Sequence, residues 1–247
     1  MQHLPPEYKA EASLWRLWRN NWLFIGTTLL LLIFNGVMIA TSNQGDTLVA
    51  INQLRTPFWD IFFKVGTHFA EPVAYAGVLL VVSAVSYRKA IFVVVAGAMA
   101  GILAGILKAL FAQARPMRWF FDNYEEIWHS LSLFEEDWRS WDETSSFPSG
   151  HATSAFALYG FLAFSARRGK LSVSAGCLAL AVMVATSRMY LLYHFLRDVT
   201  VGAWLGLCVA ALAYYLQKST FPDRPKLDAG WLDLFRQRET QKESSGV

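Results

Sequence analysis

Long apolar runs separated by short polar segments set the pattern of this chain. A helix needs about 17–25 mainly apolar residues to cross a bilayer. Six runs of this kind predict six transmembrane helices, near residues 22–40, 61–85, 90–111, 152–166, 171–187 and 199–216. The second run is the least regular, because charged residues and a proline interrupt its first half, from Lys64 to Pro72. The pattern therefore predicts an all-α fold, a polytopic membrane protein built as a six-helix bundle.

Composition supports this prediction and excludes several classes of protein. Hydrophobic residues make up 54% of the 247 residues and charged residues 17%, which is too apolar for an ordinary soluble domain. The net charge of +3 is small, and no basic stripe with interleaved aromatic residues is present, so we expect no nucleic-acid partner. Cys177 and Cys208 lie inside apolar runs, where they are expected to be small core residues rather than a disulfide or metal ligands.

Positive charge alternates along the connections between the runs. Lys and Arg gather before the first run, at residues 88–89, at residues 167–170, and after the last run. Because short loops rich in Lys and Arg stay in the cytoplasm, both termini are expected there. The loops near residues 43–56 and 113–147, and the junction that follows Arg188, are then expected on the outer side of the membrane.

These features divide the chain into three parts. Residues 1–21 form a cytoplasmic interfacial segment, in which tryptophans and basic residues are expected to anchor the chain at the lipid–water boundary. Residues 22–217 form the six-helix membrane domain, with an outer loop at about 113–147. Residues 218–247 form a polar cytoplasmic tail, expected to be loose apart from a short helix near residues 231–235.

The outer loop between the third and fourth runs has an amphipathic pattern. Apolar residues recur in it at alternating spacings of four and three, as on one helical face. They are Ile127, Leu131, Phe134, Trp138 and Trp141. We predict an amphipathic helix that lies in the interface on the outer side, over the site. This helix could serve as a packed cap or as a lid that selects lipid head groups. The many acidic residues of the loop favour the cap.

Glycines in the third run predict close helix packing. Gly97, Gly101 and Gly105 recur every four residues, a stripe of small residues that lets helices approach each other. Lys108 follows three residues after Gly105, so we expect it on the same face, pointing into the bundle. Arg115 lies seven residues further on and shares this face if the helix persists.

A second stripe lies at the start of the last run. His194, Asp198, Gly202 and Gly206 recur every four residues. The two glycines predict another closely packed helix pair. The histidine and the carboxylate are one helical turn apart, so the stripe predicts a His–Asp pair at the end of a packed seam.

Charged residues at the outer ends of the runs predict a site for an anion. A charge beside an apolar membrane segment is costly and usually serves a function. Arginine binds phosphate oxygens in a bidentate manner, and the amides at the start of a helix supply further donors. The predicted phosphate-binding residues are Lys108, Arg115, Ser149, Gly150 and Arg188.

Three further residues fit a metal-free displacement at phosphorus. His194 is the candidate nucleophile, which forms a phosphohistidine. His151 is the candidate acid that protonates the leaving oxygen and later takes a proton from water. Asp198 is expected to fix the tautomer of His194 and to stabilise its charged form. No cluster with metal-ligand spacing occurs at the outer ends of the runs, so we predict no metal and no other cofactor.

A third set of polar residues interrupts the second run. Lys64, His68 and Glu71 share one helical stripe. Structural pairing within this stripe is expected, rather than a role in catalysis.

Three segments resemble the signature of a known enzyme family. They are Lys108-x6-Arg115-Pro116, Pro148-Ser149-Gly150-His151 and Ser187-Arg188-x5-His194-x3-Asp198. Together they resemble the type 2 phosphatidic acid phosphatase family, which shares its site with vanadium haloperoxidases and bacterial acid phosphatases. The resemblance implies a metal-independent lipid phosphatase whose partners are the bilayer and a lipid phosphate. In a bacterial inner membrane the site would face the periplasm, with substrates such as undecaprenyl diphosphate or phosphatidylglycerol phosphate.

Two other functions remain open at this point. A phosphotransferase would pass the phosphoryl group from the same phosphohistidine to another lipid rather than to water. A non-catalytic transporter or lipid-binding protein would use the buried charges to pass an anion, and it would not need His194 in preference to glutamine.

Overall fold

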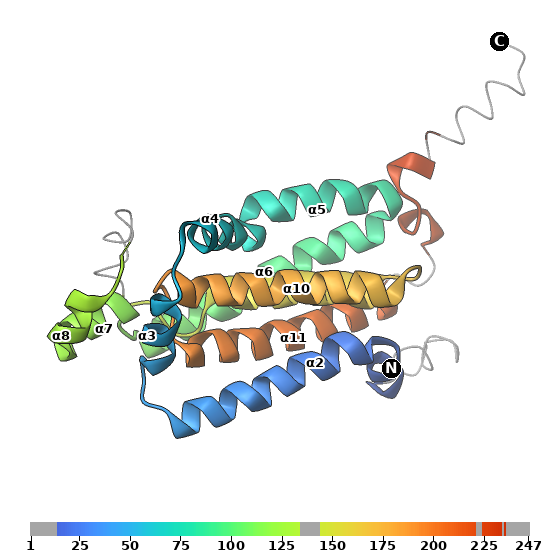
Figure 1. The fold of residues 1–247 in the computed structure, drawn as a ribbon. Coiled ribbons are helices and arrows are strands. Elements are labelled where there is room, and N and C mark those ends of the chain that lie inside the picture. Colours follow the sequence, from blue (N-terminus) through green and yellow to red (C-terminus); the bar gives the residue numbers. More distant parts are fainter. Residues whose placement is uncertain (1–13, 134–143, 221–223, 234, 236–247) are drawn as a thin grey trace, which may run out of the picture.

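The computed structural model describes residues 14–133, 144–220, 224–233 and 235, and helices dominate this part of the chain (Figure 1). Their bounds, in chain order, are α2 (Leu14–Thr41), α3 (Asp46–Gln53), α4 (Pro57–Gly66), η1 (Thr67–Ala70), α5 (Pro72–Val85), α6 (Tyr87–Phe111), α7 (Pro116–Asn123), α8 (Glu125–Ser130), α9 (Gly150–Ser165), α10 (Lys170–Tyr190), α11 (Leu196–Ser219) and η3 (Pro225–Leu227). No strand occurs among the described residues, and the prediction of an all-α membrane protein is confirmed.

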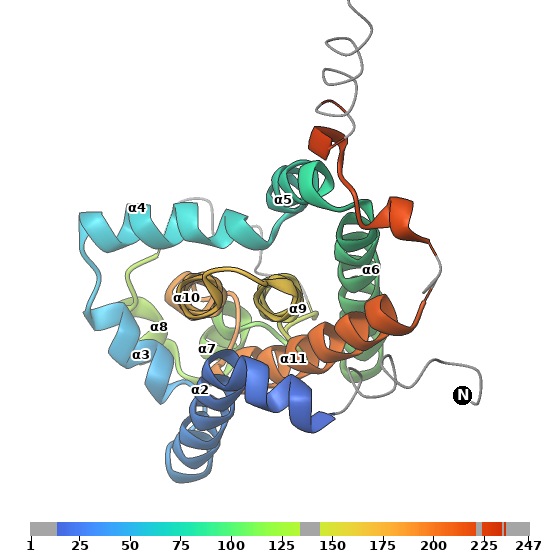
Figure 2. The same cartoon turned by 90° about the vertical axis from the view of Figure 1, so that its right-hand side faces the viewer.

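Helix α9 lies at the centre of the bundle. Viewed from the end at which α2 begins, it is surrounded by α6, α10 and α11 (Figure 2). Its residues are apolar or small on every side, and a helix of that kind is stable only when it is buried. Helix α9 therefore forms the core of the bundle along its whole length.

Helix α11 packs against α9 through its two glycines. A Cβ atom built at Gly202 would lie 2.7 Å from the carbonyl oxygen of Ser149, and one at Gly206 would lie 2.5 Å from that of Thr153. These distances are too short for any side chain, so the backbones approach each other as the glycine pattern of the last run predicted.

In the described part of the chain, four helices are long and apolar enough to cross a membrane, namely α2, α6, α10 and α11. A fifth crossing is formed if α4–η1 and α5 count as one span, although they are bent by 60° at their break. Helix α9 has 16 residues and is about 24 Å long at 1.5 Å per residue, less than the hydrocarbon core of about 30 Å. Six crossings therefore remain a prediction, which requires the bent pair and α9 each to span the membrane.

The outer surfaces of the long helices are apolar. Leu30 on α2, Val73 on α5 and Ile102 on α6 are 68%, 80% and 64% exposed. Soluble monomers rarely expose broad apolar patches, whereas lipid chains cover them without cost. This surface and the apolar spans make the chain a multi-pass membrane protein.

The predicted glycine face of α6 is largely wrong. A Cβ atom at Gly97 would lie 2.7 Å from Tyr75 on α5, but nothing lies within 4 Å of one at Gly101 or Gly105. The latter two glycines therefore do not form a helix contact in this structure.

Alanines form the buried face of α6 instead. Ala96, Ala100 and Ala104 are almost completely buried, and they also recur every four residues. Lys108 follows Ala104 by four residues, so it continues the alanine face toward α9. Arg115 does not continue this helix, because α6 ends at Phe111 and Ala112 adopts a φ of 41°. Arg115 precedes the first residue of α7 instead.

The outer loop begins with two short helices, α7 and α8, rather than one long one. Helix α8 ends at Ser130, and Leu131 is extended and buried, so the helical face expected from Ile127 onward stops there. Phe134, Trp138 and Trp141 lie outside the described residues. The described part packs on α3 and on the segment before α11, through a cluster of Leu48, Met117, Phe120, Leu131, Leu192 and Phe195.

The start of α2 and the described residues after α11 lie at the end of the bundle away from α7 and α8 (Figure 1). Helix α2 is kinked at the predicted boundary after residue 21, because the backbone of Asn21 is non-helical. The described residues of the tail are not loose. Asp228 pairs with the buried Arg88 at 2.8 Å, and the amide of Tyr87 donates to the carbonyl oxygen of Ala229. The division into three parts stays a prediction.

Candidate active site

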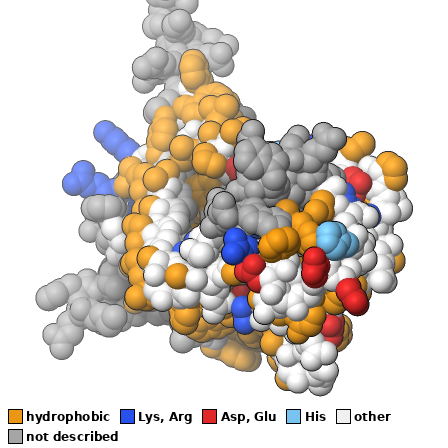
Figure 3. All heavy atoms as spheres, turned by 90° about the vertical axis from the view of Figure 1, so that its left-hand side faces the viewer, with side chains coloured by type: hydrophobic (Ala, Val, Ile, Leu, Met, Phe, Trp, Pro, Cys, Tyr) orange, Lys and Arg blue, Asp and Glu red, His pale blue; other side chains and the backbone are white. Residues whose placement is uncertain are grey.

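The candidate residues lie at the end of the bundle that carries α7 and α8 (Figure 1). There α6 and α10 end, and α9 and α11 begin. Viewed from that end, charged side chains gather on the face, while hydrophobic side chains cover the flanks (Figure 3). The candidate residues of the three motifs, which are far apart in the sequence, are brought together at this face.

His194 lies in the short segment between α10 and α11 and is 1% exposed. The amides of Tyr193 and His194 both donate to the carbonyl oxygen of Arg188, at 2.9 and 3.1 Å, which holds the segment against the end of α10. Nδ1 of His194 lies 3.7 Å from Oδ2 of Asp198, an ion-pair distance that is longer than a hydrogen bond. Nε2 is then the ring nitrogen left for chemistry.

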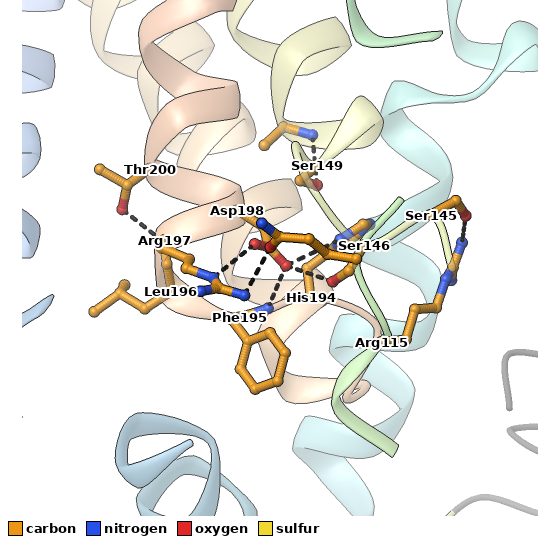
Figure 4. A network of polar contacts seen from close by, with 12 residues as sticks. Arg115, Ser145, Ser146, Ser149, His194, Phe195, Leu196, Arg197, Asp198 and Thr200 are labelled. Atoms are coloured by element: carbon orange, nitrogen blue, oxygen red, sulfur yellow. Dashed lines mark hydrogen bonds and ion pairs between the residues drawn. The ribbon is translucent and has the colours of Figure 1, made fainter. Parts of the chain in front are cut away.

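Asp198 is fully buried and is held by three neighbours (Figure 4). Ser146 Oγ donates to its Oδ2 at 2.5 Å, and the amide of Phe195 donates to the same oxygen at 2.9 Å. Arg197 Nε lies 3.5 Å from Oδ1. Sequence reasoning missed Ser146, because it acts across 52 residues. Its one local signal is its place directly before the Pro148 motif.

The start of α9 is fastened to the start of α11. The Ser149 hydroxyl accepts from the amide of Ala152 at 3.3 Å and so caps α9, and its proton remains available for an anion. The Ser149 amide donates to the carbonyl oxygen of Asp198 at 3.0 Å. Lys108 reaches this turn from α6, because a Cβ atom built at Gly150 would lie 4.0 Å from its Nζ.

Two guanidinium groups lie over the ring of Tyr193. Arg188 Cζ is 4.2 Å from the ring centre and Arg115 Cζ is 5.9 Å from it. Arg188 also donates to Thr67 Oγ1 at 2.7 Å, and Arg115 donates to Ser145 Oγ at 3.3 Å. Both arginines are buried. Tyr193 was not predicted from the sequence, although it is adjacent to His194.

His151 lies in the first turn of α9, where it interacts with the charges of Arg188, Lys108 and Arg115 and with His194. Its Nε2 lies 3.5 Å from Oε1 of Glu71. The other oxygen of Glu71 lies 2.7 Å from Nδ1 of His68. The predicted pairing of His68 with Glu71 is confirmed, but the contact with His151 places the same carboxylate at the candidate site.

Burial controls the charge of His194. Loss of hydration lowers the pKa of His194 to about 4, because the charged ring is poorly solvated inside the protein. The carboxylate of Asp198 opposes this effect, and the guanidinium of Arg188 adds to it. His194 is therefore neutral at pH 7, the form in which a ring nitrogen can attack.

The arrangement suits chemistry on a phosphate group. Three cations lie around two histidines, so an anion bound among them loses the negative charge that repels a nucleophile. Among the described residues, no group of three or more His, Cys, Asp or Glu side chains is placed to hold a metal ion.

The profile of the PAP2 superfamily matches residues 89–221, which is more than half of the chain and includes all eight candidate site residues. The chain belongs to the PAP2 superfamily. This confirms the resemblance drawn from the three motifs. Glu71 lies outside the matched region.

Two solved structures share the PAP2 fold of this chain. LpxE from Aquifex aeolicus is 23% identical, with a TM-score of 0.57 over 71% of this chain and 97% of LpxE. A transmembrane PAP2-type phosphatidylglycerolphosphate phosphatase from Bacillus subtilis is 21% identical, with a TM-score of 0.57 over 78% of this chain and 96% of the phosphatase. No curated protein matches the chain.

Proposed function

We propose that this PAP2 protein hydrolyses lipid phosphates or lipid diphosphates through a phosphohistidine. The observation that carries the proposal is the meeting of His194, Asp198 and His151 with three cations at one end of the bundle. These cations come from α6, from α10 and from the residue before α7. Membership of the PAP2 superfamily supports a phosphatase that acts on lipids.

In the proposed first step, Lys108, Arg115 and Arg188 bind the phosphate oxygens, with the start of α9 as a further donor. Nε2 of His194 attacks phosphorus, and the bond to the leaving oxygen breaks. His151 gives that oxygen a proton, so the lipid leaves as an alcohol or as a lipid monophosphate.

In the second step, His151 takes a proton from water, and the water oxygen attacks the phosphohistidine. The nitrogen–phosphorus bond breaks, inorganic phosphate leaves, and His194 returns to its neutral form. Asp198 stabilises the positive charge of His194 while the intermediate exists. The enzyme ends each cycle unchanged, and one water molecule is consumed.

The proposed substrates carry a terminal phosphate on a lipid of the outer leaflet, such as undecaprenyl diphosphate or phosphatidylglycerol phosphate. The name of one structural relative supports a lipid head group, since it is a phosphatidylglycerolphosphate phosphatase. We place the protein in a bacterial inner membrane, with six crossings, both termini in the cytoplasm and the site facing the periplasm. The cationic turn at Arg167 and Arg168, which lies at the far end of α9, supports this orientation.

Phosphate release from a panel of lipid phosphates tests the proposal. The purified full-length protein in detergent is assayed with EDTA present, beside a His194→Gln variant. We expect release from at least one lipid phosphate by the wild type, none by the variant, and inhibition by vanadate, which resembles the phosphoryl transition state. Loss of all activity in EDTA that magnesium restores would contradict the metal-free step.

The same assay separates the alternatives. A phosphotransferase releases little phosphate alone and forms a new lipid phosphate when an acceptor lipid is added. A transporter or lipid-binding protein gives no product under any condition, and His194→Gln leaves its binding of lipid phosphates unchanged.

A further inference from the structure

A cavity lined by positive charges lies at the end of the bundle opposite the candidate active site. Its volume is about 420 Å³, within the range of small-molecule sites. Four segments supply its six cations, which are Arg16 and Arg19 on α2, Lys89 on α6, Arg167 and Lys170 at the α9–α10 turn, and Lys218 on α11. No acidic residue lines the described wall of this cavity.

Two of the cations have a structural role. Lys170 Nζ donates to the carbonyl oxygens of Ala163 and Phe164, at 2.8 and 2.9 Å, and Lys89 Nζ donates to that of Ser165 at 2.9 Å. Both lysines therefore complete the C-terminal turn of α9, where a helix favours positive charge.

The arginines of the cavity need a different explanation. Positive charge on the cytoplasmic side orients a membrane protein, but orientation depends on the number of charges and not on their gathering around one hollow. Arg16, Arg19 and Arg167 are exposed and come from two distant segments, yet all three line the same cavity. Arg167 and Arg168 are both exposed in the same turn, but Arg168 does not line the cavity. A bound anion accounts for this convergence.

The rest of the wall indicates which anion fits. Leu17, Phe164 and Tyr214 add apolar surface beside the cations. Exposed tryptophans on the first turns of α2 mark the lipid–water boundary next to it. Basic pockets between membrane helices bind the head groups of acidic lipids. We propose that this cavity binds the phosphate head group of an anionic phospholipid, in the leaflet opposite to the one that supplies the substrate.

Lipid binding by matched variants tests the proposal. The full-length protein in a neutral detergent is titrated with phosphatidylglycerol, phosphatidylcholine or inorganic phosphate, and bound ligand is measured by native mass spectrometry. The test variant is Arg16→Gln/Arg19→Gln/Arg167→Gln, and the control is Arg168→Gln. Phosphate release by both variants reports their folding, and the single Arg167→Gln replaces the triple variant if that fails to fold.

We expect the triple variant to raise the apparent Kd for phosphatidylglycerol by about tenfold or more, and Arg167→Gln alone by a smaller factor. The Kd of the Arg168→Gln control should stay within about twofold of the wild type. If Arg167→Gln and Arg168→Gln weaken phosphatidylglycerol binding equally, only net charge matters, and the proposed site is overturned. The choice of an anionic lipid would be overturned if phosphatidylcholine bound as tightly as phosphatidylglycerol. It would also be overturned if inorganic phosphate displaced the lipid at equal concentration.

Glu71 supports a second inference, which rests on the proposed function. It lies at the break between η1 and α5, and it is the one carboxylate within ion-pair distance of His151 among the described residues. His151 must carry a proton to protonate a leaving oxygen, and the neighbouring cations oppose that charge. We infer that Glu71 is a positioning residue, which orients His151 through Nε2 and favours its protonated form.

The choice of leaving group separates this role from a merely structural one. An alkyl alcohol leaves only after protonation, whereas p-nitrophenolate leaves without it. Loss of a general acid should therefore reduce kcat/KM for a lipid phosphate but leave kcat/KM for p-nitrophenyl phosphate nearly unchanged. Glu71→Gln is compared with His151→Ala, and His68→Gln is the control, because His68 contacts the other oxygen of the same carboxylate.

We expect Glu71→Gln to lower kcat/KM for the lipid phosphate by about 10²-fold and to change that for p-nitrophenyl phosphate by less than about threefold. His68→Gln should stay near the wild type with both substrates. An equal fall with both substrates in Glu71→Gln would refute the positioning role while leaving the phosphatase itself established. Absence of phosphate release from the wild type would instead refute the proposed function.

Discussion

At the scale of single residues, Asp198 is the point on which the candidate site depends. It accepts hydrogen bonds from Ser146 and Phe195 and lies at ion-pair distance from His194. A buried carboxylate keeps its charge only with such partners. The residue therefore links the start of α11 to the segment before α9, and its charge also acts on the proposed nucleophile.

Substitutions at this centre should separate chemistry from orientation. We expect His194→Ala to remove turnover, and Asp198→Asn to lower kcat by about 10²–10⁴-fold, the range of a disturbed catalytic triad. Ser146→Ala removes one hydrogen bond to a charged group, worth about 1.5 kcal/mol, so a loss of about tenfold is expected. Phosphate release in detergent measures all three. Turnover by His194→Ala near the wild-type level would rule out the phosphohistidine.

The lowered pKa of His194 also predicts how stability depends on pH. Its folded value of about 4 lies below the ordinary value of about 6.5. Between these values the unfolded chain binds more protons than the folded one, so stability falls as the pH falls from 6.5 toward 4. The apparent Tm of the wild type in detergent should then drop more between pH 7 and pH 5 than that of His194→Gln. His129→Gln, at an exposed histidine, should behave as the wild type does.

At the scale of helices, the contact between α9 and α11 holds the site together. Ser149 and Gly150 start one helix, and Asp198 lies in the first turn of the other. Gly202 and Gly206 let these helices approach within backbone contact distance. The position of the phosphate-binding turn relative to the His–Asp pair is therefore fixed by two residues that have no side chain.

Alanine at Gly206 should disturb this contact. Its Cβ atom would lie 2.5 Å from the carbonyl oxygen of Thr153, so the helices must move apart. Overpacking of this kind costs about 1–3 kcal/mol, and a lower apparent Tm together with lower phosphate release is expected. Gly105→Ala on α6 is the control, because nothing lies within 4 Å of its Cβ. Equal effects of the two substitutions on Tm would contradict the assigned contact.

Local patterns predicted the helices better than the contacts between them. Apolar runs located α2, α6, α10 and α11, and spacing located the glycine seam of α11. The buried face of α6 was assigned to its glycines, although alanines of the same spacing form it, because a four-residue period does not say which small residues face a neighbour. Contacts of Asp198 with Ser146 and of His151 with Glu71 join distant segments, so no local pattern contains them.

At the scale of the whole molecule, the two ends of the bundle differ in their chemistry. The end with α7 and α8 holds the histidines, Asp198 and three cations that surround them. The other end holds the cationic cavity and the turn at Arg167 and Arg168. Because Lys and Arg in short loops orient a membrane protein, the second end is expected in the cytoplasm, which places the active site outside.

Cysteine labelling measures this orientation directly. Cys177 and Cys208 are first replaced by alanine, and a single cysteine is then introduced as Ser132→Cys or Ser172→Cys. Both serines are exposed and the substitutions are conservative, with Ser132 after α8 and Ser172 in the first turn of α10. A membrane-impermeant thiol reagent should label Ser132→Cys in intact cells and Ser172→Cys only after the membrane is broken. The reverse pattern would place the site in the cytoplasm and exclude substrates of the outer leaflet.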